Sequence, residues 1–62
     1  MKGTFLLDKY EGSVDLFKYD RKDANCLAIG KNKALAKLFE LIANEVDSMN
    51  SGETLYITFE KE

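Results

Sequence analysis

Histidine is absent from this sequence of 62 residues, and Cys26 is the single cysteine. The serine–histidine and cysteine–histidine pairs that activate a nucleophile are therefore excluded. One thiol forms no disulfide within the chain, and without histidine it cannot complete a structural zinc site. We expect no enzyme, no cofactor and no bound metal. Because paired cysteines are missing, the sequence is typical of a reducing compartment, and we expect a cytoplasmic protein.

Long apolar runs and a strong excess of one charge are also missing. No segment approaches the roughly 20 apolar residues of a membrane span, and the run ending at Leu7 is too short for the core of a signal peptide. Nine basic and eleven acidic residues give a net charge of −2, whereas general nucleic-acid binders are strongly basic. We therefore expect no membrane partner and no nucleic-acid partner. The length suits a single domain over residues 1–62 with modest stability.

An apolar stripe predicts one helix over Asn32–Asn50. Its members recur at spacings of three and four residues, so a helix places them on one side. The stripe consists of Leu35, Leu38, Phe39, Ile42, Val46 and Met49. Asn32 is the expected N-cap. Asn50 or Gly52 is expected to end the helix in the left-handed conformation.

Four segments alternate between apolar and polar residues, as strands do. They are Lys2–Tyr10, Val14–Tyr19, Cys26–Ile29 and Thr54–Glu60. The resulting order β-β-β-α-β predicts a small α+β domain. If the first three strands form a meander and the helix returns the chain, the last strand lies parallel to the first. We therefore expect a mixed sheet of order 3-2-1-4 with a right-handed crossover and the helix packed on one face.

The alternation also divides the side chains between the two faces of the sheet. The face under the helix is expected to carry Phe5, Leu7, Val14, Leu16, Leu27, Ile29, Leu55, Ile57 and Phe59. The opposite face is expected to carry Leu6, Asp8, Tyr10, Asp15, Phe17, Tyr19, Ala28, Tyr56 and Thr58. A shift of one residue in the first strand would exchange Leu6 for Leu7. Because one helix covers one face, the second face stays open.

The open face carries the candidate partner-binding residues Tyr10, Phe17, Tyr19 and Tyr56. An apolar patch of several hundred Å2 on a small protein usually marks a contact site, and tyrosine is enriched at interfaces. We predict a small non-enzymatic protein-binding module that acts as a regulator, inhibitor or accessory subunit. The alternative is that these aromatic side chains only stabilise the exposed sheet through cross-strand pairs.

Two other functions of the open face are alternatives to protein binding, and one of them is disfavoured. A structural homodimer would join two copies through the open face or through an edge strand. Stacking of nucleic-acid bases on the aromatic face is disfavoured, because Asp8 and Asp15 repel phosphates. The acids near this face, which include Glu60, instead favour a basic patch on the partner.

Three lysines at the start of the predicted helix are a candidate anion site. They are Lys31, Lys33 and Lys37, whereas acids gather at the end and exit of the helix, opposite to the preference of the helix dipole. Free N–H groups after Gly30, together with these lysines, could hold a phosphate or an acidic partner surface. An anion- or nucleic-acid-binding module that uses this helix start is therefore a further alternative function. The stretch is not a phosphate-loop motif, since its first glycine and closing serine or threonine are missing. The alternative is that the three lysines are ordinary solvated side chains.

Overall fold

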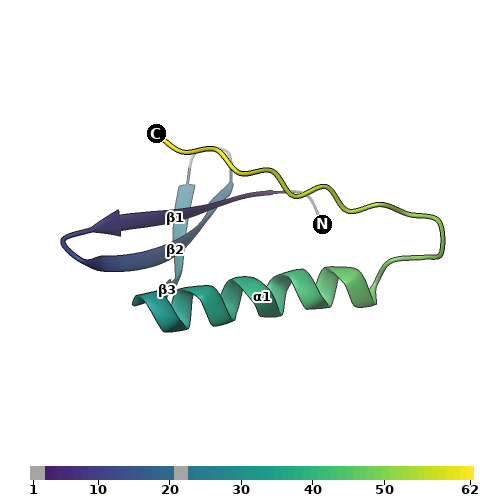
Figure 1. Cartoon of the computed structure of the whole chain (residues 1–62), viewed down its shortest axis with the longest axis horizontal. Helices are drawn as coiled ribbons and strands as arrows, with labels where there is room; N and C mark the ends of the chain where they lie inside the picture. Colours follow the sequence, from purple (N-terminus) through teal and green to yellow (C-terminus); the bar gives the residue numbers. More distant parts are fainter. Residues whose placement is uncertain (1–2, 21–22) are drawn as a thin grey trace.

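The computed structural model describes residues 3–20 and 23–62, except for the side chain of residue 20. Three strands, β1 (Thr4–Tyr10), β2 (Ser13–Asp20) and β3 (Asp23–Ile29), precede one helix, α1 (Lys31–Asp47). The strands form an antiparallel sheet of order β1-β2-β3 with α1 against one side of it (Figure 1). The expected α+β class is confirmed. The predicted start of the first strand, at Lys2, lies outside the described residues.

A two-residue turn sets the register of the first hairpin. Glu11 and Gly12 both have positive φ, 48° and 81°, which suits the type I′ turn that joins two twisted strands. The turn pairs Tyr10 with Ser13 and brings Leu6 opposite Phe17. Because directly opposed residues share a face, the register expected for the first strand is confirmed.

A β-bulge changes the face assignment of the third strand. Leu16 pairs with Ala28 and Phe17 with Cys26, so Leu27 is the extra residue between them. The extra residue breaks the period of two. Ala28 therefore lies on the helix side, and Ile29, opposite Asp15, lies on the open face with 68% of its surface exposed. The expectations for Ala28 and Ile29 were wrong for this reason.

The helix begins and ends earlier than its apolar stripe predicts. Gly30, not Asn32, is the N-cap, and it adopts φ 100° and ψ 143°. No side chain of the described residues caps this end, but the Asp15 carboxylate accepts a hydrogen bond from the Gly30 N–H at 3.2 Å. The last residues are closed by Ser48 in a right-handed conformation, not by Asn50 or Gly52. Ser48 supports this end through a 2.8 Å bond from its hydroxyl to the Glu45 carbonyl.

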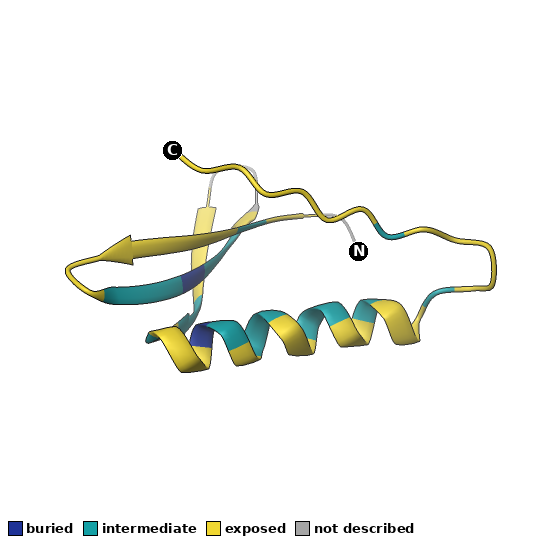
Figure 2. Cartoon of the chain, in the orientation of Figure 1, coloured by how far each residue is buried: buried dark blue, intermediate teal, exposed yellow. Residues whose placement is uncertain are grey.

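The core is small and lies between α1 and the middle of β2. Among the described residues only Leu16 and Ala34 are buried (Figure 2). The helix packs on β2 and β3. Its buried and half-buried apolar residues include Ala34, Leu35, Leu38, Leu41 and Ile42. Two residues of the predicted stripe, Phe39 and Val46, are instead exposed. They lie further round the helix, where a fourth strand would be needed to cover them.

The fourth strand is not confirmed. A turn at Asn50–Glu53 reverses the chain after α1; the Glu53 N–H donates to the Asn50 carbonyl at 3.1 Å, and the Glu53 carboxylate accepts from the Asn50 N–H at 2.6 Å. Residues 54–62 then run back on the side of β1 (Figure 1), extended but unpaired with any strand of the described chain. We call residues 54–62 the C-terminal segment.

The chain is less compact than its length allows. The Cα radius of gyration is 12.7 Å, whereas a compact domain of 62 residues has about 10.6 Å. The accessible surface is 5669 Å2, against about 4,000 Å2 for a compact protein of this mass. Much apolar surface is thus left without a covering layer.

Candidate functional site

The face of the sheet opposite α1, which we call the open face, is the main candidate site. Antiparallel pairing places Tyr10 opposite Ser13, Phe17 opposite Leu6, and Tyr19 opposite Thr4. Three of the four predicted partner-binding residues, Tyr10, Phe17 and Tyr19, are therefore brought onto one face. Tyr10 is 71% exposed and Tyr19 46%, while Phe17 is half-buried. Leu6 and Ile29 add exposed aliphatic surface to the same face.

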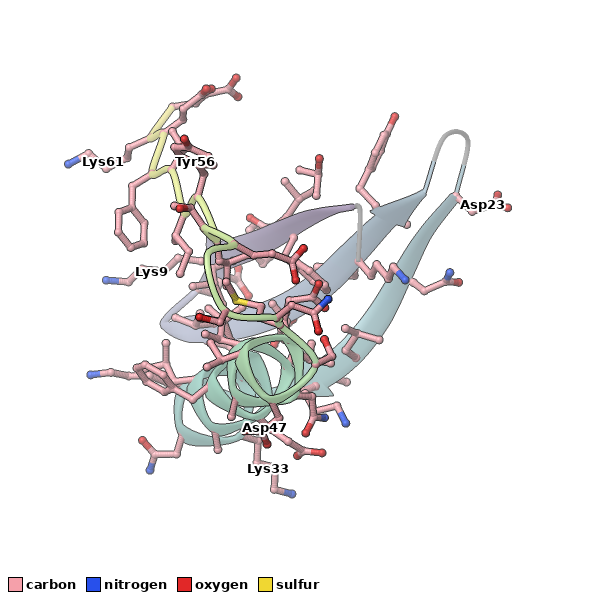
Figure 3. All side chains as sticks on the ribbon, turned by 90° about the vertical axis from the view of Figure 1, so that its right-hand side faces the viewer. Lys9, Asp23, Lys33, Asp47, Tyr56 and Lys61 are labelled. Carbon is pink, nitrogen blue, oxygen red and sulfur yellow. The ribbon has the colours of Figure 1, made fainter. Side chains whose placement is uncertain are left out.

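The fourth predicted residue, Tyr56, is not part of this arrangement. It belongs to the C-terminal segment and is 87% exposed. Figure 3 shows it beyond β1, on the same side as Lys61. It would join the open face only if the C-terminal segment paired with β1.

A groove of about 860 Å3 separates β1 from the end of the chain. One wall is β1 from Phe5 to Lys9, and the other is Glu60–Glu62. Phe17 and Ala24 extend the lining onto the open face. The groove therefore runs from the free edge of the sheet onto its aromatic surface, so a bound segment could contact both.

Along β1, and along β2 as far as Tyr19, acidic and basic side chains lie on opposite faces of the sheet. Asp8 and Asp15 are directly opposed on the open face, whereas Lys9 lies opposite Val14 and Lys18 opposite Phe5 on the helix side. Like charges directly opposed destabilise a sheet. Asp15 is partly compensated, because its carboxylate accepts bonds from the Ser13 hydroxyl and the Gly30 N–H, both at 3.2 Å. The open face is thus apolar with an acidic centre.

The three candidate anion-binding lysines do not converge. Lys31 and Lys33 lie about 200° apart around the helix, and Lys37 forms an ion pair with Glu40 at 3.5 Å. Lys33 lines a small hollow of about 350 Å3 beside residues 26–29 of β3. The carboxylate of Asp15 already faces the N–H of Gly30 at this helix start, where an external anion would have to bind.

Sequence reasoning missed Ile29 as a surface residue of the open face. A β-bulge cannot be recognised from the apolar periodicity, so the sequence gives no signal that Ile29 lies on the open face. The role of Asp15 in holding the helix start was also missed, because that bond joins residues 15 positions apart. Among the described residues, no cluster of metal-ligating side chains is present. In the same part of the chain, α1 lacks the length and apolar character of a bilayer-spanning helix.

Comparison of the chain with protein-family models, curated proteins and solved structures found no match.

Proposed function

We propose that the protein is a non-enzymatic binding module whose open face contacts a protein partner. The observation that carries the proposal is the exposed apolar surface of Tyr10, Tyr19 and Ile29 on one face of the sheet. The solvent-facing side of an antiparallel sheet usually carries polar residues. Exposed aromatic surface of this kind is instead typical of interfaces. A role as regulator, inhibitor or accessory subunit in the cytoplasm suits such a module.

A photo-crosslinking experiment tests the open face. Tyr19 is replaced by the photoreactive residue benzoylphenylalanine in cells that express the protein, and cross-linked adducts are detected by mass spectrometry. We expect protein adducts from this position, because the side chain stands on the proposed contact face. A second substitution, Tyr10→Lys, should abolish the adducts while leaving the fold intact, since Tyr10 is largely exposed.

Ala36 provides the control position. It is exposed on α1 and lies about 200° round the helix from the buried Ala34, so it points away from the sheet. The same photoreactive residue at position 36 should give few adducts with other proteins. Equal adduct yields from positions 19 and 36, or adducts that survive Tyr10→Lys, contradict the proposal.

We further propose that Thr54–Glu60 pairs with β1 as a parallel fourth strand, giving the mixed sheet of order 3-2-1-4. Three features support it. The segment is rich in β-branched and aromatic residues, it returns on the β1 side (Figure 1), and β1 is one of the two edges of the described sheet. Leu55, Ile57 and Phe59 would then cover the exposed flank of α1, and Tyr56 would join the open face.

Amide hydrogen exchange and a proline substitution test this strand. We expect slowed exchange within Thr54–Glu60, and a loss of about 1–3 kcal/mol of unfolding free energy in Ile57→Pro, because proline removes a ladder donor and leaves its acceptor unsatisfied. Glu62→Pro, beyond the strand, is the control and should leave stability unchanged. Unprotected amides in this segment, together with an unaffected Ile57→Pro variant, contradict the pairing.

A homodimer is the second candidate, and the free edge of β1 favours it. The accessible surface exceeds that of a compact monomer by about 1,700 Å2, about twice the roughly 800 Å2 that each partner buries in a standard interface. The C-terminal segment of one copy could pair with β1 of another, since exchange of an identical element is a low-cost route to dimers. The cross-linking experiment separates the candidates, because a self-adduct has twice the mass of the chain.

A further inference from the structure

We infer that the groove between β1 and Glu60–Glu62 receives a partner segment that presents lysine or arginine among apolar side chains. The inference rests on the proposed binding function and names the chemistry of the partner. Because the groove lies where Thr54–Glu60 would pair with β1, the partner segment and the fourth strand compete for the same edge. The floor supplies the apolar contacts through Leu6, Phe17 and Ala24. The charges around that floor decide which partner fits.

The acidic residues of β1 and β2 lie beside the apolar floor. Asp8 lines the groove and stands opposite Asp15, and the hydrogen bonds to Asp15 leave the Asp8 carboxylate without a compensating donor among the described residues. A basic side chain from a partner would relieve the repulsion between the two carboxylates. Lys9 and Lys18 do not do so, because they belong to the helix side of the sheet.

The end of the chain adds further acids to the groove. Glu60 and Glu62 line it together with Lys61. Figure 3 shows Lys9 and Lys61 extending outward past the edge of β1, away from the sheet. Both lysines also line the groove, which leaves the three acids Asp8, Glu60 and Glu62 against two bases.

This charge layout distinguishes among possible occupants. Nucleic acid is disfavoured, because phosphates would meet Asp8 and the terminal glutamates. A second copy docked face to face would bring acid against acid, and like charges across an interface cost several kcal/mol. A basic and apolar protein segment is the occupant whose charges complement the groove.

Two fluorescent seven-residue peptides test the inference. One alternates lysine with leucine and phenylalanine, and the other carries glutamate in place of each lysine. We measure their affinity for the full chain by fluorescence anisotropy and locate binding from amide chemical shifts. We expect the lysine peptide to bind and to shift resonances of β1 and β2 around the groove, and the glutamate peptide to bind at least fivefold more weakly.

Two charge reversals show whether the position of the acid matters. Asp8→Lys should weaken the lysine peptide roughly fivefold. Asp47→Lys makes the same change in net charge at the end of α1 (Figure 3), where a basic residue suits the helix dipole, and it should leave the affinity unchanged. Asp15 is not used, because its carboxylate also holds Gly30.

The outcomes separate this inference from the proposed function. Equal affinities for the two peptides, or equal losses in the two variants, overturn the basic partner. Failure of both peptides to bind, with cross-linking at position 19 retained, also overturns it but leaves the binding module in place. Loss of both peptide binding and cross-linking overturns the two proposals together.

Discussion

Replacing Leu16 by alanine will lower the free energy of unfolding by about 3 kcal/mol. Leu16 is the one large side chain among the described residues that is fully buried, so its truncation leaves a cavity where α1 meets β2. A single core in so small a domain rarely supplies more than about 3–5 kcal/mol in total. The variant is therefore expected to be largely unfolded. Urea unfolding followed by far-ultraviolet circular dichroism measures the loss.

Leu6→Ala is the matched control for the core substitution. This substitution removes the same atoms from a leucine on the open face, where Leu6 is already 43% exposed. Its loss should be about 1 kcal/mol or less, because less apolar area returns to water. If both substitutions lower the unfolding free energy equally, Leu16 is not at the centre of the core.

Gly30→Ala will destabilise the fold by about 2 kcal/mol. Gly30 joins β3 to α1 with φ 100° and ψ 143°, a backbone conformation that is essentially restricted to glycine. A Cβ at this position would meet no atom within 4 Å. The loss therefore reports the backbone conformation alone, and thermal unfolding compared with the unaltered chain measures it.

Gly3→Ala separates the special conformation of Gly30 from a general effect of removing glycine. Gly3 lacks a positive φ, and its nearest neighbour to an added Cβ would be the Lys18 Cε at 3.6 Å, an ordinary contact. We expect a change within about 0.5 kcal/mol. If Gly30→Ala proves equally mild, the junction between β3 and α1 has another conformation in solution.

The first hairpin and the existence of the helix could be predicted because local rules determine them. Glu11-Gly12 specifies a tight turn, and the period of two on either side then places Leu6 opposite Phe17. The helix boundaries were wrong because Asn32 resembles an N-cap in sequence, whereas the tertiary bond from Gly30 to Asp15 holds the helix start.

The rest of the open face depended on long-range geometry. The bulge beside Leu27 moved Ile29 to the surface, and no local pattern marks such an insertion. Phe39 is exposed because α1 packs on β2 and β3. This packing depends on the whole sheet and not on the local sequence. Three of the four aromatic candidates were placed together because they lie on the hairpin, where the register is local. Tyr56 depends on the pairing of a distant segment.

The bond between Asp15 and Gly30 links the open face directly to the start of α1. Asp15 belongs to the open face, while Gly30 is the residue from which α1 begins. A cationic group that drew the carboxylate toward a ligand would weaken its hold on the helix start. By thermodynamic linkage the effect is reciprocal, so a change that frays the first turn of α1 would alter the affinity of the face on the other side of the sheet. One carboxylate thus connects the open face to the N-cap residue of the helix.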